Sequence, residues 1–233
     1  MNIAIIPGRG GSKRIPRKNI LPFCGKPIIA HSIETAITSG LFNKVIVSTD
    51  DDEIADVSIR YGAEVPFVRP AELADDHTGT HPVIDHAVRW LIDRGDHVDN
   101  VCCLYATAPL IIQDDLSKAL AILEAGKWES VLAAVEYSSP IFRAFKSTEN
   151  GGIEMFFPEH YSTRSQDLPV AMYDAGQFYW ATADSCITPP KGFHDKSTVI
   201  TIPSWRAQDI DTFEDWKRAE VIFQMMQDKI KIK

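Results

Sequence analysis

Short apolar runs alternate with longer amphipathic stretches along most of the chain, and this alternation restricts the possible folds more than any other feature of the sequence. Gly40 and Gly62 stand just past the ends of two amphipathic stretches, where glycine commonly ends a helix. Strand–helix–strand units of this kind predict a doubly wound α/β domain around a parallel sheet. We expect strands at residues 3–6, 44–48, 100–104, 130–135, 177–181 and 199–202, and helices at residues 27–39, 51–61, 81–94, 114–124 and from 212 onward.

The alternation is interrupted between residues 137 and 175, where prolines and the Asn150-Gly151-Gly152 turn separate short extended pieces. We interpret this segment as a small insertion within a single domain that spans residues 1–233. Beyond it, Thr212 and Asp215 have the spacing of a capping box at the start of the last predicted helix.

The overall charge restricts the partners of the chain. It carries 24 Lys and Arg residues against 32 Asp and Glu residues, a formal net charge of −8, which disfavours broad binding to nucleic acid. No stretch approaches the roughly 18 consecutive apolar residues of a membrane span. The four cysteines include one close pair, Cys102-Cys103, without the CxxC spacing of a zinc or redox site. We therefore expect a cytoplasmic protein with reduced thiols and no membrane or nucleic-acid partner, in which any positively charged site is local.

The loop at residues 7–19 concentrates positive charge directly after the first predicted strand. Glycines allow its backbone to approach an anion and to offer N–H groups, while Arg and Lys neutralise phosphate charge. Ligands bind at such strand ends in open α/β sheets, so we expect a polyphosphate; a solvated basic loop is the alternative. The loop matches neither GxxxxGK(S/T) nor GxGxxG, which argues against a P-loop kinase or a nicotinamide dehydrogenase. The glycines are Gly8, Gly10 and Gly11, and the basic residues are Arg9, Lys13, Arg14, Arg17 and Lys18.

Two carboxylates, Asp209 and Asp211, come just before the last predicted helix. On extended backbone, residues two apart point to the same side, so both can face one cation while Ile210 turns into the core. Two carboxylates together with phosphate oxygens and water suit Mg²⁺. The alternative is that Asp211 only supports the helix N-terminus. We expect the acidic run at residues 50–52 to cap the helix that follows it.

Several motifs resemble those of the CMP-sialic acid synthetase family, in the expected order and over about residues 3–220. The segment IIPGRGGSKRIPRKNI is similar to the family's nucleotide-binding loop, usually IPARGGSKxxPxKN, although Gly8 stands where relatives commonly have Ala. The segments VSTDDDEIA, VRPAELADD, ATAPL, RSQDLP and DIDTFED continue the match, although Tyr105 replaces a Gln of relatives. Within the family, LYATAPL and YDAGQFYW resemble the branch that activates pseudaminic acid, a bacterial diamino nonulosonate of flagellins and surface glycans.

The resemblance implies a Rossmann-like three-layer nucleotidyltransferase fold with a mostly parallel central sheet. It also implies a Mg²⁺-dependent reaction in which CTP and a nonulosonic acid give a CMP-sugar and pyrophosphate, and a homodimer formed through the inserted segment at residues 137–175. Catalysis would rest on Arg9, Lys18, Asp209 and Asp211, with the two aspartates holding Mg²⁺. The nucleotide would contact Gly8, Gly10, Gly11, Ser12, Lys13, Asn19, Arg69 and Thr78. The acceptor sugar would contact Arg164, Gln166, Asp167, Tyr173, Asp174 and Gln177.

Two alternatives stay open at this point. A synthetase for CMP-sialate, CMP-legionaminate or CMP-3-deoxy-octulosonate lies within the same class, because a few polar groups can decide which acid fills the pocket. A catalytically silent nucleotide-binding protein lies outside it. The intact basic loop together with Asp209 and Asp211 argues against the silent protein.

Overall fold

The computed structural model describes residues 1–188, 192 and 194–231. Six of its strands form one central sheet in the order β10-β6-β9-β5-β1-β4. Strand β1 is parallel to β4 and β5, β10 is parallel to β6, and β9 lies antiparallel between β5 and β6. The sheet is therefore mostly parallel, as the sequence predicts. These strands are β1 (Asn2–Pro7), β4 (Lys44–Ser48), β5 (Asn100–Leu104), β6 (Ser130–Glu136), β9 (Met172–Thr182) and β10 (Ser197–Thr201).

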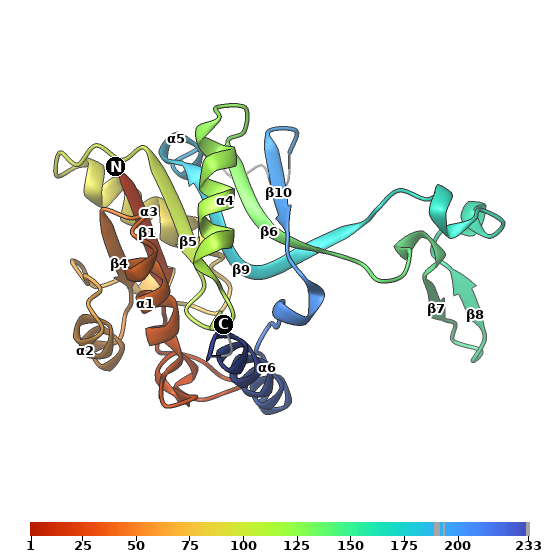
Figure 1. Cartoon of the computed structure of the whole chain (residues 1–233), viewed down its shortest axis with the longest axis horizontal. Helices are drawn as coiled ribbons and strands as arrows, with labels where there is room; N and C mark the ends of the chain where they lie inside the picture. Colours follow the sequence, from red (N-terminus) through yellow and green to blue (C-terminus); the bar gives the residue numbers. More distant parts are fainter. Residues whose placement is uncertain (189–191, 193, 232–233) are drawn as a thin grey trace.

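Helices cover both faces of the sheet (Figure 1). One face packs against α1 (Ile28–Ser39), α2 (Asp52–Arg60) and α4 (Gln113–Glu124), and the other against α3 (Thr80–Ile92) and α5 (Ala183–Cys186). The C-terminal helix α6 (Phe213–Lys231) packs on a third cluster with Ile15 and Phe23. Among the described residues, no helix is both long and apolar enough to cross a membrane.

The central strands contribute alternate residues to the two sides of the core. In β1, Ala4 and Ile6 join the cluster under α1, α2 and α4, whereas Ile3 and Ile5 join the cluster under α3. Strands covered on both faces appear in a sequence as continuous apolar runs. This explains why β4 and β5 have the bounds that the sequence predicts.

A projecting arm, which we define as residues 137–171, leaves the body of the molecule beyond the ends of β6 and β9 (Figure 1). It contains an antiparallel hairpin of β7 (Phe145–Ser147) and β8 (Ile153–Met155). Several of its apolar side chains are exposed, and Tyr161 retains 75% of its accessible surface. The arm lacks the buried core that the body has.

The remaining short elements lie in loops. Strands β2 and β3 pair with one another in the loop before α1. They span Pro22–Phe23 and Lys26–Pro27, and 3-10 turns occur at Lys18–Ile20, Ala71–Leu73, Ile141–Arg143, Pro158–His160, Ser165–Asp167 and Ser204–Arg206.

Strand β9 is longer than the sequence predicts, because it begins at Met172 and not near residue 177. Its first half pairs with the outer end of β6 past a register shift between Leu132 and Ala134. At this place Gly176 has a φ of 62°, and its N–H donates to Asp174 Oδ1 over 2.8 Å. Local sequence does not reveal such a strand, because only its pairing with β6 holds it extended.

The predicted start of the last helix is confirmed. The Asp215 N–H donates to Thr212 Oγ1 over 3.2 Å, and the Thr212 N–H donates to the Asp215 carboxylate over 2.9 Å. These reciprocal hydrogen bonds form a capping box, and hydrogen bonds to the Asp215 carboxylate from the Thr212 hydroxyl and then from the Thr212 N–H lower its pKa. The helix therefore begins just after Thr212, and Asp209 and Asp211 precede it in a loop.

Candidate active site

A pocket of about 220 Å³ opens at the carboxyl ends of β1 and β5, between the loop that follows β1 and the N-terminus of α3. We call it the charged pocket. Its position is the strand end at which the sequence predicts a ligand. Its walls comprise Pro7, Arg9, Ser12, Lys13, Arg14, Ile15, Lys18, Asn19, Arg69, Thr78, Gly79, Thr80, Val83, Tyr105, Ala106 and Thr107.

Two cations of the loop converge on one carboxylate in front of α3. Arg9 donates to Asp76 Oδ1 over 2.9 Å and to the Asp75 carbonyl over 2.6 Å, and Lys13 forms an ion pair with Asp76. Hydrogen bonds from Lys13 and then Arg9 lower the pKa of the Asp76 carboxyl. The two cations are therefore held at the mouth of the pocket by a group that phosphate oxygens can replace.

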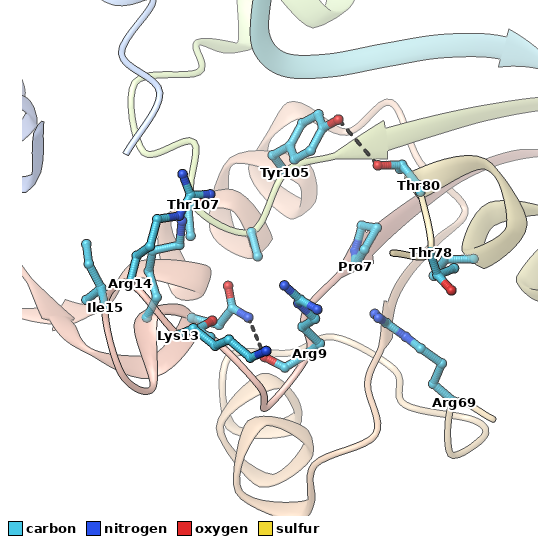
Figure 2. Close-up of a pocket in the computed structure, with 16 residues that line it drawn as sticks. Pro7, Arg9, Lys13, Arg14, Ile15, Arg69, Thr78, Thr80, Tyr105 and Thr107 are labelled. Carbon is cyan, nitrogen blue, oxygen red and sulfur yellow. Dashed lines mark hydrogen bonds between the residues drawn. The ribbon is translucent and has the colours of Figure 1, made fainter. Parts of the chain in front are cut away.

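Arg69 supplies a buried positive charge to the same pocket. Only 4% of its surface is exposed, and its guanidinium donates to the Ser48 hydroxyl and the Ser48 carbonyl. The pKa of Arg69 is lowered to about 10, mainly by burial, which the nearby Asp50 opposes and Arg9 reinforces. Arg69 therefore stays charged near neutral pH. Figure 2 shows Arg9 and Arg69 pointing toward the same space, across from Tyr105 and Thr80.

The loop also binds the segment that carries the two predicted metal ligands. Lys18 Nζ donates to the Ile210 carbonyl over 2.6 Å and lies 3.5 Å from Asp211 Oδ1, while Arg14 lies 2.5 Å from Asp211 Oδ2. The Ile210 side chain is fully buried, as strand-like alternation predicts. These contacts bring Asp211 beside cations that are almost two hundred positions away in the sequence. Asp209 is exposed.

The glycines of the loop keep its backbone close to the protein. The N–H groups of Gly8 and Gly10 donate to the Ser48 carbonyl and to Asp50 Oδ1, over 2.9 and 3.1 Å. A Cβ on Gly10 would lie 2.6 Å from the Asp51 carboxylate, so any larger side chain there would displace it. Gly11 has open space around it. None of Gly8, Gly10 and Gly11 lines the charged pocket, so in this arrangement the cationic side chains provide most of the positive charge.

Arg17 is the one basic residue of the loop that turns away from the pocket. Its guanidinium forms ion pairs with Asp51 and Glu53, and its backbone is left-handed with a φ of 57°. Asp51 also caps α2 by accepting the Ile54 N–H over 3.0 Å, which is the predicted role of this acidic run. The pKa of the Asp51 carboxyl is lowered, first by Arg17. Arg17 therefore fixes the loop to α2.

A second pocket, of about 330 Å³, adjoins the first on the side of the sheet that α3 and α5 cover. We call it the apolar pocket. The two pockets share Thr80 and Tyr105, whose hydroxyl oxygens lie 3.4 Å apart (Figure 2). The walls of the apolar pocket comprise Thr80, His81, Ile84, Val101, Cys103, Tyr105, Glu129, Ser130, Leu132, Tyr179, Ala181, Ser185, Cys186, Thr188, Gly192, His194 and Ser197.

Two tyrosines and a carboxylate lie near the junction of the pockets. The Tyr179 hydroxyl donates to Asp174, and the rings of Tyr105 and Tyr179 lie 5.8 Å apart. Burial raises the pKa of the Asp174 carboxyl, and the negative charge of Asp209 raises it further. Burial also raises the pKa of Tyr105 to about 12. The Tyr105 phenol therefore remains a neutral hydrogen-bonding group at physiological pH.

The predicted acceptor residues do not form one cluster in this chain. Arg164 and Asp167 lie on the arm and pair with each other, with Arg164 Nε 2.8 Å from Asp167, and Gln166 lies between them. The Tyr173 ring packs against the Tyr137 ring at the base of the arm, with the two ring planes inclined by 55°. The remaining two lie in the body: Asp174 binds Tyr179, and the buried Gln177 donates to the Arg206 carbonyl over 2.6 Å.

Comparison with known proteins decides the family. Residues 3–155, more than half of the chain, match the family model described as cytidylyltransferase. The chain belongs to the cytidylyltransferase family. The family predicted from the motifs is confirmed, and this cytidylyltransferase is accordingly an enzyme of the nucleotidyltransferase class.

Individual relatives agree with this assignment. The cytidylyltransferase is 44% identical to pseudaminic acid cytidylyltransferase of Campylobacter jejuni, over 96% of this chain and 97% of the relative. It is 31% identical to CMP-N,N'-diacetyllegionaminic acid synthase of Legionella pneumophila, over 98% of each chain. A solved CMP:2-keto-3-deoxy-manno-octonic acid synthetase complexed with CTP has a TM-score of 0.70 and 17% identity, covering 97% of this chain and 99% of that one. The structural similarity confirms the Rossmann-like α/β fold.

Sequence reasoning named Thr78 but missed Gly79 and Thr80 at the start of α3, and it missed the apolar pocket. Thr78, Gly79 and Thr80 line the charged pocket at the N-terminus of α3, where the helix dipole favours an anion. A Thr-Gly-Thr run directly before an amphipathic stretch is a signal that could have marked this end. The apolar pocket had no such signal, because its walls come from five separate segments of the chain.

Proposed function

We propose that this enzyme transfers a cytidylyl group from CTP to pseudaminic acid, giving CMP-pseudaminic acid and pyrophosphate. The observation that carries the proposal is the junction, at Thr80 and Tyr105, of a cationic pocket with a largely apolar one. A triphosphate requires the first kind of wall, and a deoxygenated, acylated sugar acid suits the second. The 44% identity to the Campylobacter enzyme favours pseudaminic acid over the other nonulosonic acids.

The reaction requires positioning and charge neutralisation more than covalent catalysis. The anomeric hydroxyl attacks the α-phosphorus in line with the departing pyrophosphate, so no enzyme nucleophile is needed. Arg9, Lys13 and Lys18 would exchange their present carboxylate and carbonyl partners for phosphate oxygens. Arg69 and Asn19 would hold the nucleotide from the floor of the pocket; the Asn19 side chain already donates to the Arg9 carbonyl over 2.8 Å.

Mg²⁺ fits the donors that Asp209 and Asp211 offer. Among the described residues, no three His, Cys, Asp or Glu side chains form a metal-holding group by themselves. A site with one or two carboxylates completed by phosphate oxygens and water is the usual site for Mg²⁺. Bound there, the ion would supply charge neutralisation at the phosphates and polarise the attacking hydroxyl.

The arm would complete the site in a homodimer. Arg164, Gln166 and Asp167 belong to the arm that projects from the body (Figure 1), and none of them lines either pocket of its own chain. They would contact the acceptor only where the arm of one subunit covers the pocket of another, with exposed apolar residues such as Tyr161 in the interface. Sedimentation equilibrium at micromolar concentration should give a dimer, and Tyr161→Glu should shift it toward monomer. A monomeric wild type would contradict this arrangement.

We place the enzyme in the cytoplasm as a single domain of residues 1–233, with the product used for flagellin and surface glycans. The experiment that tests the activity is pyrophosphate release from the purified protein with Mg²⁺ and CTP, using pseudaminic, sialic, legionaminic and 3-deoxy-octulosonic acids, with UTP and ATP as nucleotide controls. We expect release with CTP and pseudaminic acid. Release with another acid alone would assign the enzyme a different acceptor within the CMP-sugar synthetases. No release with any acid would favour a nucleotide-binding protein without catalysis.

A further inference from the structure

His81 presents a buried nitrogen that has no hydrogen-bond partner. It is the second residue of α3, directly after Thr80, and it lines the apolar pocket. Its Nε2 is buried from solvent and has no hydrogen-bond partner among the described residues. Buried polar atoms nearly always have a partner, so an orphan in a pocket wall points to a ligand group.

The other polar side chains around His81 are already engaged. The Tyr179 hydroxyl donates to Asp174, and the Tyr105 hydroxyl lies 3.4 Å from Thr80 Oγ1. Farther along the wall, Ser130 Oγ donates to Ser197 Oγ over 2.9 Å, and Ser185 Oγ donates to the Thr182 carbonyl over 3.0 Å. Of these wall side chains, His81 is the one whose buried polar atom has no partner among the described residues.

The surroundings define the chemistry of that group. Ile84, Cys103 and Cys186 form apolar wall on the same side of the sheet, and burial raises the pKa of both thiols so that they stay uncharged. A carboxylate would lose its hydration here without a cation among these neighbours, whereas an amide with a methyl end would match both the nitrogen and the apolar wall. A histidine nitrogen donates or accepts according to its tautomer, and an acylamino group offers both a carbonyl and an N–H.

We propose that His81 is a specificity-determining residue whose Nε2 hydrogen-bonds an acylamino group of the acceptor sugar, with the acyl methyl against Ile84, Cys103 and Cys186. This inference rests on the proposed function. It explains how the acceptor reaches the charged pocket: its anomeric end lies at Thr80 and Tyr105, while its acylamino end lies deeper beside α3.

The test compares His81→Phe and His81→Gln with wild type in steady-state pyrophosphate release with CTP and pseudaminic acid. His81→Phe removes the nitrogen and should lower kcat/KM for the acid by about tenfold to a hundredfold, the effect of leaving one buried hydrogen bond unmade. His81→Gln places an amide near the Nε2 position and should recover most of the loss. The KM for CTP and the midpoint of thermal unfolding should stay close to wild type in both variants.

A matched control is available on the same helix. His86 also has a buried ring nitrogen without a partner among the described residues, but it packs against Phe67 and lines neither pocket. His86→Phe should leave the KM for the acid unchanged. An equal loss in His86→Phe and His81→Phe would assign the effect to α3 in general and overturn the proposal.

A second acceptor tests the chemical group. With an acid in which the acylamino groups are replaced by free amines, the ratio of kcat/KM between wild type and His81→Phe should fall close to one. If His81→Phe lowers kcat/KM by the same factor with both acids, recognition of the acyl group by His81 is overturned. His81→Phe activity within about twofold of wild type would overturn the role of His81 while the proposed function stands; absence of pyrophosphate release by wild type would instead overturn the proposed function, and this inference with it.

Discussion

The two pockets share Thr80 and Tyr105 yet have opposite chemistry. The charged pocket is lined by Arg9, Lys13, Arg14, Lys18 and Arg69, most of them from one loop. The apolar pocket is built from strand and helix side chains in the layer beneath α3 and α5. A loop can bring several positive charges together because carboxylates on other segments form ion pairs with its side chains. A continuous apolar wall instead forms only where strands and helices pack against one another.

On the proposed function, the comparison teaches that recognition of the two substrates is divided between a wall of loop side chains and a wall of strand and helix side chains. Charged side chains on a loop can exchange partners when phosphate binds, and Asp76 and Asp211 are the groups they would leave. Side chains such as Val101 and Leu132 are buried in strands and keep their positions. We therefore expect changes in the charged pocket to alter nucleotide kinetics, and changes in the apolar pocket to alter acceptor kinetics.

The largest effect is expected from Asp211→Ala. Loss of this carboxylate would remove a proposed Mg²⁺ ligand and leaves Arg14 and Lys18 without their ion-pair partner, so kcat should fall by about a thousandfold. Stopped assays of pyrophosphate release at saturating CTP and Mg²⁺ measure this. Asp114→Ala, an exposed carboxylate on α4, is the control. Wild-type turnover in Asp211→Ala at saturating Mg²⁺ would contradict the assignment.

Two arginines of the same loop give the next comparison. Arg9→Ala would remove the proposed charged hydrogen bonds to phosphate and should lower kcat/KM for CTP by about a hundredfold. Arg17→Ala should lower it less than about fivefold, because Arg17 pairs with Asp51 and Glu53 and does not line the pocket. Equal losses in the two variants would mean that charge anywhere in the loop, and not its position in the pocket, binds the nucleotide.

A larger side chain in the apolar pocket should affect the acceptor and not CTP, the reverse of the effect expected for Arg9→Ala. Ala181 is a partly buried wall residue on β9, and Ala181→Leu would occupy space beside Val101. We expect the KM for the acceptor to rise by about tenfold, with the KM for CTP unchanged. Initial-rate measurements with each substrate varied in turn would check this, and a rise in the KM for CTP alone would break the division between the pockets.

A smaller effect is expected at the mouth of the charged pocket. Asp76 binds Arg9 and Lys13, so Asp76→Asn should free both cations and lower the KM for CTP by about threefold, as expected for partly exposed ion pairs. The effect should diminish in high salt, which screens these charges. An increase in the KM for CTP would instead show that the carboxylate assists binding.

The smallest effect concerns stability at the junction. Burial and then Asp209 raise the pKa of the Asp174 carboxyl in the folded protein. The protonated carboxyl therefore contributes stability that is fully present below the unfolded pKa of about 3.9 and is lost as pH rises through the folded pKa. Asp174→Asn cannot ionise. The midpoint of thermal unfolding of Asp174→Asn, relative to that of wild type, should therefore rise by about 1–3 °C as the pH is raised from 4 to 8. A constant difference between the unfolding midpoints of the two proteins over this pH range would contradict the raised pKa.

Much of the body could be predicted from the sequence. Strands β4 and β5 have their predicted bounds because strands buried on both faces require continuous apolar runs. The start of α6 was equally readable, because the Thr212–Asp215 capping box is local. The first half of β9 was not readable, since it is extended only by pairing with β6.

The site divides in the same way. The sequence by itself determined that the basic loop lies at a strand end, and that cations and carboxylates suited to a nucleotide and Mg²⁺ occur in one chain. The family resemblance already placed Arg69 at the nucleotide, and the structure puts it in the wall of the charged pocket. Only the tertiary structure decided that Arg17 points toward α2, because its ion pairs depend on neighbours far away in sequence.

The same reason applies to the apolar pocket. Its walls are brought together by packing of α3 and α5 on the sheet, and no single segment carries its pattern. His81 looked like an ordinary helical residue until its Nε2 proved to be buried without a partner. The sequence determines which groups a chain possesses, and the long-range packing of the fold decides which of them face a common space.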